Sequence, residues 1–184
     1  HTEIMLNYFG ANVTSQGTTA SIEPEPVLNG REIKVPGDIS SAAFFIAAGL
    51  IVKGSDFVIK NVGVNHTRSG IIDIVSRMGG CVEIMNEHII AGEPCADIRV
   101  QYTGTLNGCV IEGEDIPRLI DELPVIAVLA SQAEGETIVR NAGDLRNKES
   151  DRIKCLVNEL TKIGVNIEET QDGFIVRGKK ELSG

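Results

Sequence analysis

The segment Asp144–Arg152 (DLRNKESDR) holds the densest group of charged side chains that could do chemistry. If a helix opens near Asn147, Lys148 and Arg152 lie four residues apart and share one helix face. Two cations beside free helix N–H groups can bind a carboxylate or a phosphate, and Glu149 between them could move a proton. The alternative is a solvated first turn whose acidic side chains only offset the helix dipole.

A second acidic segment, Glu114–Pro124 (EDIPRLIDELP), places Asp121 and Glu122 directly before the apolar run Leu123–Ala127. A carboxylate beside the buried start of a helix can accept hydrogen bonds from hydroxyl groups or take up a proton. The same acidic side chains could instead serve only to stabilise the positive end of that helix.

The segment Val35–Phe45 offers several N-cap residues for a following helix, namely Asp38, Ser40 and Ser41. The N–H groups at the start of such a helix form a ready site for an anion. An ordinary capped helix at a domain hinge is the alternative.

The segment Val64–Gly70 (VNHTRSG) places Arg68 in the first turn of a helix that Thr67 is expected to cap. A cation at that position is unfavourable for the helix dipole, which indicates an anionic neighbour for Arg68. The alternative is a solvated arginine.

An internal repeat organises the elements that must position these residues. A helical pattern followed by Gly and a β-rich segment occurs three times, around Phe9–Val13, Met78–Val82 and Ile163–Ile167. Gly at these positions is expected to end each helix in the left-handed conformation. A second similarity, between Ala47–Gly63 and Ala127–Gly143, extends the unit to helix, strand, helix, strand, strand.

Periodicity and turn residues predict the individual elements. We expect helices over 2–9, 40–52, 68–78, 116–133 (irregular at Pro117 and Pro124) and 148–163. We expect strands near 11–14, 33–35, 56–61, 81–85, 98–102, 108–112, 137–141, 165–170 and 173–177, the last two joined by a hairpin at Asp172-Gly173. Two units then fit between Pro36 and Gly178, after the tail of a third. Because that first unit is incomplete and the chain opens on His1, we expect an internal piece of a longer protein.

The composition argues against partners of several classes. The net charge is −9 and no basic face is visible, so a nucleic-acid partner is not expected. A local group of cations can still hold an anionic substrate within an acidic protein. The longest apolar run, Ala42–Val52, is shorter than the about 20 residues that a membrane span requires, so no membrane association is expected.

The cysteine and histidine spacings predict neither a zinc site nor a disulfide framework. No two of the four cysteines form a C-x-x-C pair, and the three histidines are scattered. Idle or buried thiols are typical of a reducing compartment, so a cytoplasmic location is expected.

Together the four charged segments resemble the EPSP synthase (3-phosphoshikimate 1-carboxyvinyltransferase) family. The family signatures GDxSSA, GxNxTRxG, an Asp-containing helix start and R-x-K-E-S/T-D-R are similar to Gly37–Ala42 (GDISSA), Gly63–Gly70 (GVNHTRSG), Ile120–Pro124 (IDELP) and Arg146–Arg152 (RNKESDR). Their order and spacing match along essentially the whole chain, and the last motif is the most specific.

The resemblance implies an α/β (α+β) fold built from repeated βαβαββ units, the inverse α/β barrel-like fold of the enolpyruvyl transferases. It implies two domains that close on substrate between them. Residues 1–35 would be the tail of one domain, and residues 36–184 would form two units of the other.

The resemblance also implies an activity and a role for five residues. The enolpyruvyl group of phosphoenolpyruvate would pass to the 5-hydroxyl of shikimate 3-phosphate with release of phosphate, without a metal or an organic cofactor. Asp121 would hydrogen-bond the shikimate hydroxyls and act in proton transfer, Lys148 would contact the same region, and Glu149 would be an acid/base. Arg152 would bind phosphoenolpyruvate, and Asp144 stands where the family places a polar contact to shikimate 3-phosphate, often Asn.

Several family features are missing from the chain: an N-terminal Lys loop, a phosphoenolpyruvate-binding Arg region and an Asp-His-Arg motif. We therefore expect the fragment alone to be inactive and to need the remainder of a parent enzyme, itself a monomer. Two alternatives stay open. One is the related enolpyruvyl transferase that acts on UDP-N-acetylglucosamine; the other is a non-catalytic binding module of the same fold.

Overall fold

The structure is a computed structural model that describes residues 1–179 and 182. The remaining positions of the predicted 36–184 region, 180, 181, 183 and 184, lie outside the described residues. The elements are α1 (Thr2–Phe9), β1 (Val13–Gln16), β2 (Thr19–Ile22), α2 (Ile39–Ile51), β3 (Asp56–Gly63), α3 (Gly70–Arg77), β4 (Cys81–Ile90), β5 (Glu93–Gln101), β6 (Val110–Ile111), the 3₁₀ helix η1 (Gly113–Arg118), α4 (Leu123–Gln132), β7 (Gly135–Val139), the 3₁₀ helix η2 (Gly143–Asn147), α5 (Arg152–Lys162), β8 (Asn166–Thr170) and β9 (Gly173–Gly178).

Left-handed glycines mark the points where three helices give way to strands. Gly10, Gly79 and Gly164 have φ angles of 106°, 85° and 90°, and they follow α1, α3 and α5. Side chains with a Cβ rarely adopt this conformation, whereas Gly does so readily. The predicted helix–Gly–strand repeat is therefore confirmed at all three places.

The second half of the chain forms one βαβαββ unit, in the order β6, α4, β7, α5, β8, β9. Its sheet has the strand order β6-β7-β9-β8, in which only the β6–β7 pair is parallel. The preceding unit runs α2, β3, α3, β4, β5 with the sheet order β3-β5-β4, and a single parallel bridge between Gly37 and Val62 stands in for its first strand. The two units thus repeat both the element order and the strand order.

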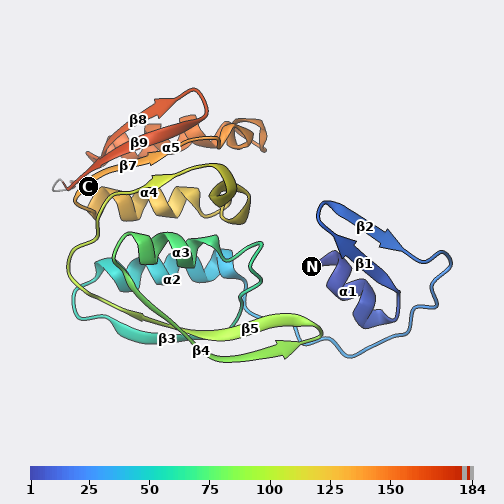
Figure 1. Cartoon of the computed structure of the whole chain (residues 1–184). Coiled ribbons are helices and arrows are strands. Elements are labelled where there is room, and N and C mark those ends of the chain that lie inside the picture. Colours follow the sequence, from blue (N-terminus) through green and yellow to red (C-terminus); the bar gives the residue numbers. More distant parts are fainter. Residues whose placement is uncertain (180–181, 183–184) are drawn as a thin grey trace.

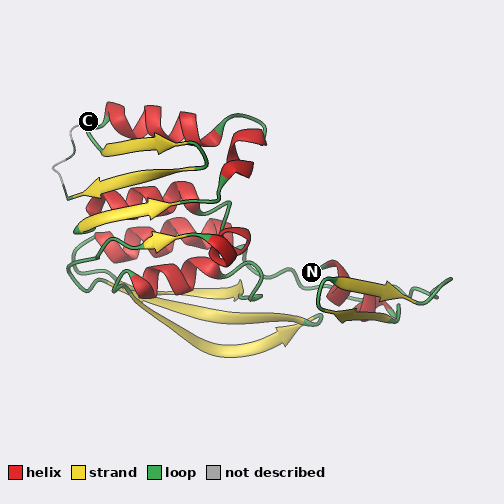
Figure 2. Ribbon diagram, turned by 45° about the horizontal axis from the view of Figure 1, so that its top comes forward, coloured by secondary structure: helices red, strands yellow, loops and turns green. Residues whose placement is uncertain are grey.

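Helices α2, α3 and α4 lie between the two sheets (Figure 1). α2 and α3 pack on the three-stranded sheet, α4 and α5 pack on the four-stranded sheet, and the two layers meet where α2 contacts α4 (Figures 1 and 2). The elements α1, β1 and β2 repeat the last three elements of a unit and lie to one side, beyond an extended connection (Figure 1). In residues 1–179 and 182, no helix has both the length and the apolar character needed to cross a membrane.

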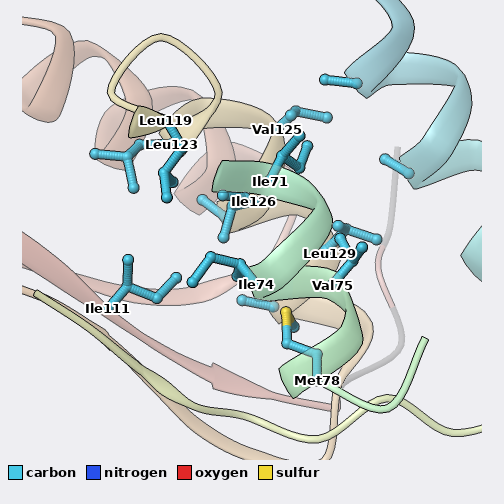
Figure 3. Close-up of a cluster of buried hydrophobic side chains, with 14 of the residues drawn as sticks. Ile71, Ile74, Val75, Met78, Ile111, Leu119, Leu123, Val125, Ile126 and Leu129 are labelled. Atoms are coloured by element: carbon cyan, nitrogen blue, oxygen red, sulfur yellow. The ribbon is translucent and has the colours of Figure 1, made fainter. Parts of the chain in front are cut away.

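The core between the layers follows from the helical spacing of apolar residues. Ile71, Ile74 and Met78 occur at intervals of three and four and point toward α4, where Ile126 and Leu129 are equally buried (Figure 3). Burying each such side chain stabilises the fold by roughly 1.5–3 kcal/mol. The apolar core therefore fixes the helices whose first residues carry the charged motifs.

The predicted helix over 116–133 is not one element, because the chain forms η1 and then α4 with a break between them, and the irregularity predicted at Pro117 and Pro124 is confirmed. Pro124 lies in the first turn of α4, where its missing N–H leaves no hydrogen bond unmade. Pro117 lies inside η1. The break leaves Asp121 and Glu122 in the turn that leads into α4.

Two predicted helix starts are also wrong. Asp151 caps α5 by accepting a hydrogen bond from the backbone N–H of Lys154 at 3.0 Å, so the helix begins at Arg152 and Lys148 precedes it. The other helix begins at Gly70, and Thr67 does not cap it, because the Thr67 hydroxyl donates to Asn65 Oδ1 at 2.9 Å.

The predicted strands differ from the structure mainly at their ends. Residues 33–35 are not a strand, and β2, which is exposed along its length, was not predicted. The hairpin β4–β5 is longer than expected. A register shift between Met85 and His88 interrupts the alternation of apolar and polar residues from which a strand is predicted. The predicted hairpin of β8 and β9 is confirmed, but the predicted turn pair Asp172-Gly173 is wrong by one residue, because Gln171 and Asp172 form the turn and Gly173 is the first residue of β9.

The close approach of β9 to β7 yields a first prediction. A Cβ on Gly173 would collide with the backbone carbonyl of Val139, whereas a Cβ on exposed Gly30 would meet no heavy atom within 4 Å. We expect Gly173→Ala to lower the free energy of unfolding by at least about 1–3 kcal/mol, and Gly30→Ala to change it by less than about 1 kcal/mol. Urea unfolding followed by circular dichroism measures both variants; equal midpoints would contradict the packing described here.

Candidate active site

Asp121 lies at the centre of a group of three cations that approach it from different parts of the chain. Its Oδ2 accepts a hydrogen bond from Arg68 Nη1 at 3.0 Å, and its Oδ1 lies 3.3 Å from Arg152 Nη1 and 3.8 Å from Lys148 Nζ. All four side chains are partly exposed. Asp121, Lys148 and Arg152, which the sequence predicted as site residues, are therefore brought together.

The site forms where the first residues of four helices meet. Ser40 is in the first turn of α2, Arg68 precedes α3, Asp121 precedes α4, and Arg152 opens α5. Helix N-termini carry unpaired N–H groups and a partial positive charge. The backbone therefore adds to the positive field of the side chains at this end of the molecule.

The local fold of Val64–Gly70 positions Arg68. The backbone N–H of Arg68 donates to the carbonyl oxygen of buried Asn65 at 2.8 Å, and Thr67 N–H donates to Asn65 Oδ1 at 3.1 Å. Asn65 is itself held by Glu93, whose Oε2 lies 3.0 Å from Asn65 Nδ2. The turn is thus fixed, and the anionic neighbour that the sequence indicated for Arg68 is Asp121.

The carboxyl group of Asp121 is ionised at neutral pH. The hydrogen bond from Arg68 lowers its pKa most, and the charges of Lys148 and Arg152 act in the same direction against the effect of burial. An ionised carboxylate with two oxygens in this position can accept hydrogen bonds from substrate hydroxyls.

Glu122, next along the chain, has the opposite environment. Its side chain is 0% exposed, burial raises its pKa, and its Oε1 accepts a hydrogen bond from the Ser40 hydroxyl. Its Oε2 is buried and has no hydrogen-bond partner in the described part of the chain. Neighbouring carboxyl groups with pKa values displaced in opposite directions are typical of sites that handle protons.

Glu149 joins the group only at its edge. Its Oε2 lies 2.7 Å from Arg152 Nη2, and its side chain is 80% exposed. The pKa of Glu149 lies below its ordinary value because its own backbone N–H donates to it and because Arg152 lies beside it. Glu149 is linked to Asp121 only through Arg152, which pairs with both carboxylates.

Asp144 lies outside the group. It is exposed in η2 and forms no hydrogen bond or ion pair with any residue that the structure describes. Arg146, from the same motif, instead holds the fold together: it donates to the carbonyl oxygens of Thr170 at 2.6 Å and Gln171 at 2.9 Å and pairs with Asp151 at 2.8 Å. These bonds fix the start of α5 against the β8–β9 hairpin.

The anion site predicted at the start of α2 is already filled by a side chain. Asp38 accepts hydrogen bonds from the backbone N–H groups of Ser40 at 3.2 Å and Ser41 at 2.8 Å, so Asp38 is the N-cap among the three candidates that the sequence offered. The pairing of Ser40 with Glu122 was not predicted. The two residues are 82 positions apart, and no spacing rule links them.

The comparisons with known proteins agree with this geometry. The family model described as EPSP synthase (3-phosphoshikimate 1-carboxyvinyltransferase) matches residues 1–184. The chain is 52% identical over 184 residues to the 3-phosphoshikimate 1-carboxyvinyltransferases of Desulforudis audaxviator and of Brevibacillus brevis. It superposes on the EPSP synthase of Acinetobacter baumannii with a TM-score of 0.93 at 41% identity, covering 100% of this chain and 41% of that one.

The two curated relatives are longer than this chain. Each match covers 100% of this chain but only 43% of the relative. The structural match confirms the repeated βαβαββ architecture as the enolpyruvyl transferase fold. Because the family model covers every residue, the chain belongs to the EPSP synthase family.

Proposed function

We propose that this chain is part of an enzyme that transfers the enolpyruvyl group of phosphoenolpyruvate to the 5-hydroxyl of shikimate 3-phosphate and releases phosphate. The observation that carries the proposal is the ionised carboxylate of Asp121 among Arg68, Lys148 and Arg152. Both substrates are anions, and the cations can bind them while the carboxylate accepts a hydrogen bond from a hydroxyl.

The proposed chemistry is an addition followed by an elimination. The 5-hydroxyl oxygen attacks C2 of phosphoenolpyruvate while C3 gains a proton, which gives a tetrahedral intermediate. Loss of phosphate from C2 and of a proton from C3 then gives the enol ether. Asp121 is the proposed acceptor at the attacking hydroxyl, and Glu149 is the proposed acid and base at C3.

Lys148 and Arg152 are the proposed substrate-binding cations, for shikimate 3-phosphate and phosphoenolpyruvate respectively. Arg152 is held by one partly exposed and one exposed carboxylate, and Lys148 approaches Asp121 only to 3.8 Å. Both can therefore turn to a substrate without losing buried contacts. We also propose a polar contact from Asp144 to shikimate 3-phosphate, since it shares the segment that carries Lys148.

The scheme needs groups from the rest of a parent enzyme. We propose that residues 1–35 are the tail of one domain and that 36–184 form two units of the other, with the crossover near Val35-Pro36. The separate position of α1, β1 and β2 in Figure 1 supports this division. We further propose that the parent enzyme is a cytoplasmic monomer.

The two alternatives receive less support. The two curated relatives compared above carry the name 3-phosphoshikimate 1-carboxyvinyltransferase, which favours shikimate 3-phosphate over UDP-N-acetylglucosamine as substrate. A non-catalytic module would have no reason to gather Lys148 and Arg152 around Asp121 and to pair Arg152 with Glu149.

The first functional prediction concerns the chain by itself. Assayed for phosphate release with both substrates, the isolated chain should show negligible turnover, because its site is half of a cleft. The full-length parent should turn over under the same conditions. A normal rate for the isolated chain would refute the proposed need for the parent enzyme.

The second functional prediction concerns Arg152. In the full-length parent, Arg152→Gln should raise the KM for phosphoenolpyruvate by roughly 10–100-fold, the equivalent of one lost hydrogen bond to a charged group. The matched control is Arg177→Gln, which removes an arginine that pairs with Glu136 and Glu168 on the four-stranded sheet. Steady-state kinetics with varied phosphoenolpyruvate decide the matter, and an unchanged KM would favour the binding module.

A further inference from the structure

The three cations around Asp121 differ in what else holds them. Arg68 is anchored on two sides: Nη1 donates to Asp121 Oδ2, and Nη2 donates to Ser40 Oγ at 3.0 Å. The Ser40 hydroxyl in turn donates to Glu122, whose side chain is completely buried. Arg68 is thus tied to the buried interior through two side chains.

Lys148 and Arg152 have no such anchor. Lys148 Nζ lies 3.8 Å from Asp121 Oδ1, beyond ordinary hydrogen-bond distance, and makes no other ion pair with a described residue. The other partner of Arg152 is Glu149 on the surface. Either cation can leave Asp121 at little cost, whereas Arg68 cannot.

The contacts also divide the two oxygens of Asp121. Arg68 bonds Oδ2, while Lys148 and Arg152 face Oδ1. When these two cations turn to anionic substrates, Oδ1 becomes available to a substrate hydroxyl. Oδ2 stays bonded to Arg68, so the carboxylate keeps its orientation and one balancing charge.

We propose that Arg68 is a positioning residue that holds Asp121 through Oδ2 while Lys148 and Arg152 bind substrate, and that the buried Ser40–Glu122 pair holds Arg68. The role of Oδ1 toward a hydroxyl rests on the proposed function; the anchoring of Asp121 does not. A cation placed before a helix opposes the helix dipole, and the ion pair with Asp121 offsets that cost.

The charges around Asp121 agree with this role. Glu122 Oε1 lies 3.8 Å from Arg68 Nη2, so a second carboxyl group faces the guanidinium from the interior, and burial raises the pKa of Glu122. Asp38 also lies within the field of Arg68. The charged and titratable groups that face Asp121 or its direct partners are Asp38 on α2, Arg68 before α3, Glu122 at α4, and Lys148, Glu149 and Arg152 at α5.

The first test follows the Asp121 carboxyl carbon by ¹³C NMR during a pH titration of the full-length parent, with the signal assigned by its loss in Asp121→Asn. Arg68 lowers the pKa of Asp121, so Arg68→Gln should move the titration midpoint to higher pH. The control Arg99→Gln removes an arginine that pairs with Asp56 on the three-stranded sheet, and it should leave the midpoint in place. An unmoved midpoint in Arg68→Gln would overturn the proposal.

The second test is kinetic and uses the same protein. Arg68→Gln should reduce kcat by about 10²-fold, the cost of a misplaced catalytic group, with little change in the KM for phosphoenolpyruvate because Arg152 remains. The acid limb of its kcat/KM profile should lie at higher pH, since activity requires ionised Asp121. Arg68→Lys keeps the positive charge but not the two guanidinium nitrogens that bond Asp121 and Ser40. It should therefore lower kcat, with a smaller shift of the acid limb.

The outcomes separate the two proposals. If the unmodified parent does not turn over these substrates, the proposed function fails and the NMR titration still decides the role of Arg68. If the parent is active and Arg68→Gln and Arg68→Lys both retain full kcat, the positioning role is wrong.

Discussion

The ion pair between Asp121 and Arg68 is the contact on which the site depends. It keeps a carboxylate ionised and oriented at the meeting point of four helix starts, where backbone and side chains otherwise create a positive field. Without an anion there, Arg68, Lys148 and Arg152 would repel one another. With it, part of this positive charge is offset, and two of the three cations remain available to bind an anion.

Duplication of the fold explains how these residues meet. Arg68 precedes α3 and Arg152 opens α5, and these helices occupy the same place in the two βαβαββ units. The units pack through α2 and α4, so the starts of all four helices lie on one side of the two-unit part, the side that faces α1, β1 and β2 (Figure 1). The apolar face of each helix fixes its position in the core, and the residues at its start carry the chemistry.

Local signals allowed part of this to be predicted. The left-handed glycines are short-range features, and they were predicted correctly. Asp38 was one of three candidate caps for α2. The starts of α3 and α5 were predicted too early, because several residues in a row could cap and tertiary contacts chose among them. The Ser40–Glu122 pair escaped prediction because only the packing of α2 against α4 brings residues so distant in sequence together.

The most direct measurement of the central claim is the kcat of the full-length parent with Asp121→Asn, which keeps the size of the side chain and removes its charge. If an ionised Asp121 accepts the hydroxyl proton, kcat falls by roughly 10²–10⁴-fold, the usual contribution of a general base, while phosphoenolpyruvate still binds. A variant with undiminished kcat would show that the carboxylate only spaces the cations, and the account of the site would be wrong.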